Sequence, residues 1–367
     1  MLHFSKVVPL LVGLGLSLGA APAAWAQSND ATPKYSNEFL NIGVGGRALG
    51  MGNTQVSIVQ DATAGYWNPA GLLDLKTKYD GVLMHSELFS GIVKNDYAAF
   101  AMPLDENSAI GASLIRLGVD DIADTRDLVN EYGYIQYDRI RYFSVADYAL
   151  LLSYARRIGA IEGLKLGVNA KIIYRNVGKF ANAYGFGVDA GLQYEHQGWR
   201  LGLMARDITT TFNVWSIDAD EFKGSATTID EIPSNSSEVT LPRLILGVGR
   251  SIKLPGQFTA LVATDLEMTT DGQRNTPIST GLISIDPHAG LEIGYNNVVF
   301  LRGGVSNFQK IQAFSGKEEW KAQPSLGVGV TTSGLRLDLA LSRLAVEKLG
   351  QRSQTNSIIV SLGYGFK

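Results

Sequence analysis

The sequence predicts an all-β protein: a 14-stranded antiparallel transmembrane β-barrel with an N-terminal hatch, or plug. Three observations lead to this fold class. The chain begins with a short apolar run, continues with the glycine-rich segment Phe39–Leu73, and from Lys76 onward consists of fourteen apolar or alternating stretches of strand length. Such a series of alternating segments, after an N-terminal part too broken for a long helix, is typical of a plugged barrel.

The first residues predict an exported protein. His3 and Lys6 precede the apolar run Val7–Leu18, and Ala24-Trp25-Ala26 follows as an A-x-A cleavage site. A transmembrane helix needs about 20 apolar residues, so a signal peptide is the better interpretation. We therefore predict a signal peptide over residues 1–26, a hatch over residues 27–75 and an outer-membrane barrel over residues 76–367.

Composition restricts the remaining function classes. The chain has 367 residues, a formal net charge of −3, 41 glycines and no cysteine. This charge gives no basic face for nucleic acid, so no nucleic-acid partner is expected. The lack of cysteine excludes disulfides and cysteine metal sites. No second apolar run of spanning length follows the first, so any membrane crossing must be made by strands.

The expected strands are named here by residue range. They are Tyr79–Leu88, Tyr97–Leu104, Ala109–Gly118, Tyr148–Arg157, Leu164–Arg175, Tyr184–Glu195, Trp199–Asp207, Arg243–Ile252, Phe258–Met268, His288–Tyr295, Val299–Ser306, Ser325–Thr332, Leu335–Leu344 and Ser357–Phe366.

Alternation within these stretches separates an apolar face from a small, polar or charged face. In Leu335–Leu341, leucines at every second position alternate with Arg336, Asp338 and Ala340. A charge on the lipid face of a barrel is costly, so the charged face is expected to line the lumen. A soluble sandwich would show the same alternation. The lumen-facing charges expected from this pattern are Lys165, Lys171, Asp189, Arg200, Arg302, Arg336 and Asp338.

The connections favour the barrel over the sandwich. Short linkers such as Ser333-Gly334 alternate with long ones such as Val119–Asp147 and Ile208–Pro242. Outer-membrane barrels have short periplasmic turns and longer external loops, whereas Greek-key sandwiches have no reason for this regularity. An even strand count then predicts both termini in the periplasm of a Gram-negative cell.

The segment Asn37–Leu73 carries a family resemblance. Ala48-Leu49-Gly50-Met51-Gly52, Asp61-Ala62-Thr63-Ala64 and Trp67-Asn68-Pro69-Ala70-Gly71-Leu72 resemble the hatch of FadL-type outer-membrane proteins, which have an Asn-Pro-Ala box before the first of fourteen strands. The run from Asn37 to Gly52 looks closer to the PorV/PorQ branch, which is associated with type IX protein secretion. The hatch residues expected from this resemblance are Asp61, Asn68, Pro69, Ala70 and Gly71; an ordinary Asn-Pro turn is the plainer interpretation.

The resemblance implies two functions of different classes. The main hypothesis is a PorV-type accessory or cargo shuttle of type IX secretion, which binds translocon, attachment machinery or exported cargo through its external loops. The alternative is a FadL-like passive transporter of hydrophobic small molecules such as fatty acids or hydrocarbons. Expected partners are the lipid bilayer, secretion-system proteins or cargo, and a hydrophobic ligand. A partner-docking rim, or a cap over the barrel mouth, is expected from aromatic residues assigned to loops, namely Phe212, Trp215, Phe222, Phe314 and Trp320.

Other chemistry finds little support in the sequence. The segment Gly43–Ala48 lacks the flanking strand and helix of a dinucleotide loop. The luminal charges are of mixed sign, which favours a paired, wet interior over an ion path. Acidic residues of the loop Ile208–Pro242 lack calcium-loop spacing, the histidines lack zinc-type spacing, and no G-x-S-x-G motif occurs. We therefore expect no enzyme activity, no cofactor and no metal.

Overall fold

The structure is a computed structural model. It describes residues 36–130, 132–222, 236–270, 272–312, 318–348 and 351–366. The predicted signal peptide lies outside this part, as does Phe314. Within these residues, no helix is both long enough and apolar enough to cross a membrane.

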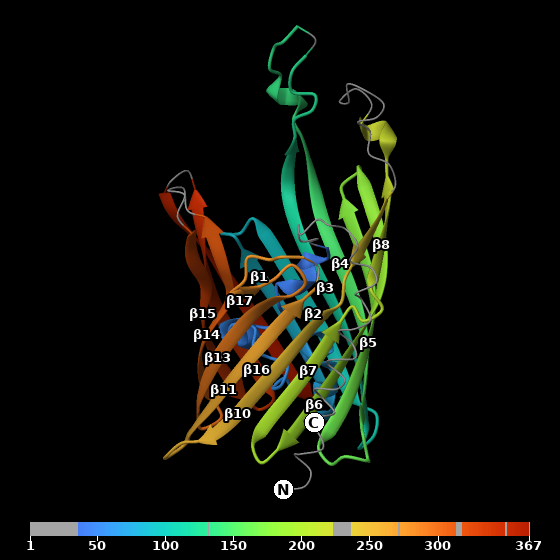
Figure 1. The fold of residues 1–367 in the computed structure, drawn as a ribbon. Coiled ribbons are helices and arrows are strands. Elements are labelled where there is room, and N and C mark those ends of the chain that lie inside the picture. Colours follow the sequence, from blue (N-terminus) through green and yellow to red (C-terminus); the bar gives the residue numbers. More distant parts are fainter. Residues whose placement is uncertain are drawn as a thin grey trace.

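Fourteen antiparallel strands close into a barrel (Figure 1). Each pairs with its neighbour in chain order, and the ring closes where Tyr79 of β1 stands opposite Phe366 of β17. The barrel strands are β1 (Tyr79–Leu88), β2 (Val93–Pro103), β3 (Ser108–Asp124), β4 (Arg141–Arg157), β5 (Leu164–Val177), β6 (Ala181–His196), β7 (Trp199–Arg206), β10 (Arg243–Lys253), β11 (Phe258–Thr269), β13 (Ser284–Tyr295), β14 (Val299–Gln312), β15 (Glu318–Thr332), β16 (Leu335–Lys348) and β17 (Gln351–Phe366).

The predicted fold class is confirmed, and each expected stretch corresponds to one barrel strand. The tight turns lie at one rim and the long hairpins at the other, shown at the top of Figure 1. Several strands extend into stretches expected to be loops, because pairing with a neighbour satisfies the backbone beyond the clearly alternating residues. Three short strands extend the wall without adding to the fourteen: β8 (Thr211–Ile217) pairs with β6 and with β9 (Ser236–Thr240), and β12 (Ile278–Ser279) pairs with β13.

The outer face of the barrel is apolar. Leucines 335, 337, 339 and 341 of β16 are all between 39% and 57% exposed, whereas Ala340 between them is 2% exposed. The same division recurs on β15 and β17, where Leu326 and Val360 point outward and Ser325 and Ser361 are buried. A continuous band of exposed apolar side chains is the surface that an acyl-chain environment requires.

This band predicts a depth-dependent response to charge. Leu339→Arg, in the middle of β16, should destabilise the membrane-inserted barrel by about 2–4 kcal/mol, while Leu335→Arg, at the turn rim, should cost about 0–1 kcal/mol. Unfolding in urea from lipid bilayers measures both. Equal costs at the two positions would contradict a lipid-facing outer surface.

The N-terminal segment, from Ser36 to Leu75, lies inside the barrel and is called the hatch below (Figure 1). It contains short helices only: η2 (Glu38–Asn41), α2 (Gly46–Gly50), α3 (Ala64–Trp67) and η3 (Pro69–Asp74). Wall glycines let its backbone approach the strands. A Cβ added at Gly304 would lie 2.2 Å from the backbone of Met51 and Gly52, and one at Gly202 would lie 2.4 Å from the Val56 carbonyl oxygen. The lumen is therefore filled by packed hatch.

Candidate functional site

The Asn-Pro-Ala box joins two parts of the hatch to the barrel wall. Asn68 is fully buried, and its Nδ2 donates to the carbonyl oxygens of Val56 and Leu192, at 2.9 Å each. Its Oδ1 accepts from the backbone N–H of Ala70 at 3.2 Å, which caps η3. Pro69 occupies the first position of this helix, where no donor is needed. A single amide thus ties the hatch chain to itself and to β6.

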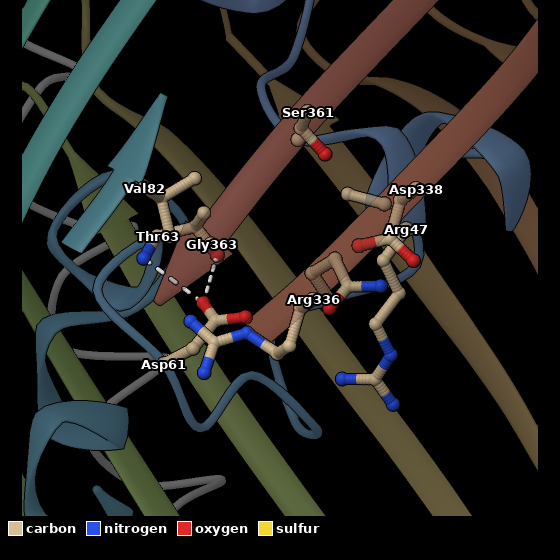
Figure 2. Close-up of a pocket in the computed structure, with 11 residues that line it drawn as sticks. Arg47, Asp61, Thr63, Val82, Arg336, Asp338, Ser361 and Gly363 are labelled. Atoms are coloured by element: carbon tan, nitrogen blue, oxygen red, sulfur yellow. Dashed lines mark hydrogen bonds between the residues drawn. The ribbon is translucent and has the colours of Figure 1, made fainter. Parts of the chain in front are cut away.

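Asp61 and Gly71 occupy the neighbouring turns. The Asp61 carboxylate accepts from the backbone N–H of Thr63 at 2.9 Å and from its hydroxyl at 2.5 Å. Figure 2 shows it beside Arg336 of β16, in a pocket of about 20 Å³ that is large enough for one water. A Cβ at Gly71 would lie 2.5 Å from the Val59 carbonyl oxygen, so this approach requires glycine.

A belt of ion pairs links the hatch to one side of the lumen. Arg302 on β14 donates from Nε to Glu292 on β13 and from Nη1 to Asp338 on β16, both at 2.6 Å. The hatch enters this belt through Arg47, whose Nε lies 2.9 Å from Glu292. On the neighbouring strands, both Nη atoms of Arg336 donate to Asp80 of β1 at 2.8 Å. Figure 2 shows Arg47, Arg336 and Asp338 around the small pocket.

A second group of pairs lies on the opposite wall. The Lys171 ammonium, 3% exposed, lies 2.9 Å from Asp189 and 2.5 Å from Asp207. Lys165 pairs with Asp74 at the end of the hatch. Arg200 is 3.4 Å from Glu195, near the turn rim. The luminal charges named from the sequence thus fall in separate paired groups, and they do not converge on one ligand site.

The barrel wall is interrupted between β7 and β8. The four residues Asp207–Thr210 separate these strands, and only two residues, Leu241 and Pro242, separate β9 from β10. The regular pairing therefore stops after Arg206 opposite Arg243 and resumes at Thr211 opposite Thr240. Asp207 and Thr210 have positive φ values, 56° and 61°. This is a bulge in the wall, and bulges often stand beside functional sites.

The start of the hatch is fastened to this interruption. Thr240 Oγ1 lies 2.7 Å from both the Ser36 hydroxyl and Asn37 Nδ2. Asn213 on β8 donates to Asn37 Oδ1 at 3.0 Å. Just below, the Arg206 guanidinium donates to the Leu40 carbonyl oxygen and lies 4.6 Å from the Tyr66 ring. These five wall-to-hatch contacts are called the latch below.

A cavity of about 330 Å³ lies between the hatch and the upper parts of β10–β17, and is called the vestibule below. The hatch contributes Glu38, Asn41, Ile42, Leu49 and Asn53, and the wall contributes mostly serine, amide and charged side chains. A smaller cavity of about 130 Å³ shares Glu267, Arg274, Asp286, Asn307 and Gln309 with it. No local sequence pattern predicts the vestibule, because the residues that line it come from eight strands and the hatch.

The four described aromatic residues that were predicted to lie in loops belong to three different elements. Phe212 and Trp320 lie in β8 and β15, both with more than half of their surface exposed. Trp215 also lies in β8, where it donates to Glu238 at 3.0 Å. Phe222 packs near Phe180, with ring centroids 5.9 Å apart. Trp320 lies in a strand because β15 extends beyond its expected start, whereas Phe212 and Trp215 lie in a separate strand, β8, that forms within the expected loop Ile208–Pro242.

A different aromatic surface projects from the barrel. The β3–β4 hairpin extends above the other described strands in Figure 1. Its tip exposes Tyr132, Tyr134 and Tyr137 to 76%, 71% and 72%. The Asn130 carboxamide oxygen accepts from the backbone N–H groups of Tyr132 and Tyr134 at 3.0 Å, which holds the turn. A run of four tyrosines between 132 and 142 was the signal available in the sequence.

Among the described residues, no group of three histidine, aspartate or glutamate side chains is placed to hold a metal ion.

Comparison with solved structures identifies the class of fold to which this barrel is similar. The chain is similar to the Ralstonia pickettii toluene transporter TbuX (12% identity, 89% of this chain and 99% of that one, TM-score 0.56). It is also similar to the Pseudomonas putida toluene transporter TodX (15%, 88% and 97%, TM-score 0.55) and to a Pseudomonas aeruginosa FadL homologue (11%, 88% and 98%, TM-score 0.51). No family profile and no curated protein matches the sequence. The similarity shows a FadL-type barrel fold, and the PorV/PorQ branch finds no support in it.

Proposed function

We propose that this protein is an outer-membrane uptake barrel, in which a small molecule binds in the vestibule and passes the hatch. The observation that carries the proposal is a cavity of ligand size directly above a hatch that fills the lumen. The solved structures with this fold include toluene transporters, which supports a transport role over an enzymatic one. We place the tight-turn rim, and with it both termini, in the periplasm.

The latch offers the way out of the vestibule. The hatch residues Glu38, Asn41 and Ile42 that line the vestibule directly follow Ser36 and Asn37, which are fastened to the interrupted wall. Release of these contacts would open the floor beside the bulge without unfolding the Asn-Pro-Ala box. The latch and the ion pairs of Glu38 with Arg243 and Arg274 hold this end, so its release is a local movement of the first hatch residues.

Uptake by outer-membrane vesicles tests this function. Vesicles with and without the protein are offered radiolabelled toluene, hexanoate and sucrose separately. Faster entry of at least one probe with the protein present, and its loss when the hatch is cross-linked to the wall, is the expected result. Identical entry of all three probes with and without the protein would overturn the proposal.

A second candidate is docking of a protein partner, for which the tyrosine hairpin is the specific observation. Arg126 at its base hydrogen-bonds Asp124 and lies 4.4 Å from the Phe180 ring. The hydrogen bond from Arg126 lowers the pKa of Asp124 to about 2. The stability that this pair gives the hairpin is therefore fully present above about pH 4 and is lost as the pH falls through 2. Exposed tyrosines on a buttressed hairpin are typical of interaction surfaces.

The hypothesis of a type IX secretion accessory belongs to this second candidate. Its support is the resemblance of the segment Asn37–Gly52 together with the hairpin. The titles of the similar solved structures, by contrast, name transporters and channels and no secretion component. Tyr132→Ala/Tyr134→Ala should abolish co-purification of secretion components, with the barrel-wall variant Tyr154→Ala as control. Unchanged protein export in a deletion strain would contradict the secretion role.

A further inference from the structure

The vestibule differs in chemistry from a hydrocarbon site. Only Ile42, Leu49, Leu88 and Phe89 of its lining are apolar. The neutral hydrogen-bonding residues outnumber them: Asn41, Asn53, Ser306, Asn307, Gln309, Gln323, Ser325, Ser342 and Ser357. A hydrocarbon in this space would displace water from polar groups and offer them no replacement hydrogen bond, which disfavours its binding.

The charged lining residues are already paired with one another. Arg243 lies 2.5 Å from Glu267 and 3.2 Å from Glu38, and Arg274 lies 3.1 Å from the same Glu38 oxygen. His288 lies 3.4 Å from Asp286. An anionic ligand would compete with these carboxylates for the arginines. The electrostatics therefore favour an uncharged solute.

Hydroxyl groups form a row along one side of the vestibule. Ser325, Ser342 and Ser357 stand in direct register on β15, β16 and β17, all buried and facing inward. Cross-strand neighbours of this kind are about 5 Å apart, and each hydroxyl both donates and accepts hydrogen bonds. Gln323 already donates to the Ser342 hydroxyl at 2.5 Å, which leaves that hydroxyl's own proton for another acceptor.

Two buried acceptors at these cavities have no hydrogen-bond partner among the described residues. Asn53 lines the vestibule and Thr269 lines the smaller adjoining cavity, but Asn53 Oδ1 and Thr269 Oγ1 themselves are covered by surrounding atoms. Buried polar atoms are normally satisfied. A solute in either cavity reaches these two oxygens only after their side chains turn toward it.

We propose that the vestibule binds a small, uncharged, polyhydroxylated solute of mono- or disaccharide size; this inference rests on the proposed uptake function. Its volume lies at the lower end of the range of ligand pockets, roughly 300–1,000 Å³, which excludes longer oligosaccharides. A polyol matches the lining because its hydroxyl groups, like those of the serine row, both donate and accept hydrogen bonds.

Sucrose, hexanoate and toluene distinguish the possible outcomes. Sucrose is titrated calorimetrically into the full-length mature protein in detergent, and entry of all three probes is measured in vesicles. The proposal expects sucrose to bind and to enter, and Ser342→Ala/Ser357→Ala to weaken its binding about tenfold. Ser153→Ala, a buried inward serine that does not line the vestibule, is the matched control and should bind as the wild type.

Each other outcome decides against the inference in a recognisable way. Entry of toluene or hexanoate without sucrose would overturn the polyol assignment and leave the uptake function standing. Entry of no probe would overturn both. If the double serine variant were not heat-modifiable on gels, and so not folded, the binding and entry of sucrose by the wild type would still decide the proposal.

Discussion

Arg302→Met should destabilise the barrel by about 3–5 kcal/mol, because it leaves the Asp338 carboxylate in the packed lumen without its cation. Arg302 is 4% exposed at its side chain and is shared by Glu292 and Asp338. Arg47 still partners Glu292 in the variant, whereas Asp338 loses the only ion-pair partner found for it in the described chain. Arg302→Met/Asp338→Leu should recover part of the loss, because an apolar pair removes the unmatched charge.

Equilibrium unfolding in urea from lipid bilayers measures the effect. Arg116→Met is the matched control, because Arg116 and its partner Asp96 are 30% and 42% exposed and such pairs contribute about 0–1 kcal/mol. A cost of Arg302→Met no larger than that of Arg116→Met would show that the belt is not part of the packed interior.

Asn68→Ala should loosen the hatch and make the barrel leak. The substitution removes the donor to two carbonyl oxygens and the acceptor of the Ala70 N–H, and each buried group left unpaired costs about 1–3 kcal/mol. Cells expressing the variant should become sensitive to large antibiotics that the outer membrane normally excludes. Exchange of hatch amides with deuterium should accelerate in the same variant.

The matched control is Asn176→Ala, a partly buried asparagine near the upper end of β5 whose Nδ2 contacts the Gly178 carbonyl oxygen. Its side chain makes no hydrogen bond to the described hatch residues, so the variant should keep wild-type permeability. Normal antibiotic resistance of Asn68→Ala, together with unchanged amide exchange, would contradict the structural role of the box.

Local sequence patterns predicted most of the fold. Alternation over Leu335–Leu344 located β16, and the contrast of tight turns with long connections distinguished a barrel from a sandwich. Strand ends were harder, because β14 and β15 extend through residues such as Ser306–Gln312 that alternate poorly and depend on cross-strand pairing. The prediction of one long loop over Ile208–Pro242 does not account for β8, although Thr211–Ile217 alternates polar and apolar residues.

The candidate site depended on contacts that sequence patterns do not encode. Alternation placed Arg336 on the polar face, but its partner Asp80 is 256 residues away. In the sequence, glycines of the inner face such as Gly304 are indistinguishable from other small residues. The structure shows that Gly304 is required because the hatch backbone lies against it. The serines that line the vestibule come from four strands, so no local sequence motif predicts it.

A disulfide between hatch and wall tests the central claim, a lumen filled by the hatch of a membrane-spanning barrel. The chain has no native cysteine, which keeps the readout clean. A Cβ at Gly50 would lie 3.6 Å from that of Ala340, within the range for a disulfide. Gly50→Cys/Ala340→Cys should therefore cross-link in membranes and shift on non-reducing gels until reductant is added. Gly50→Cys/Leu339→Cys, whose second cysteine points outward, should not cross-link. Absence of the first disulfide, or equal linking of both pairs, would contradict the account.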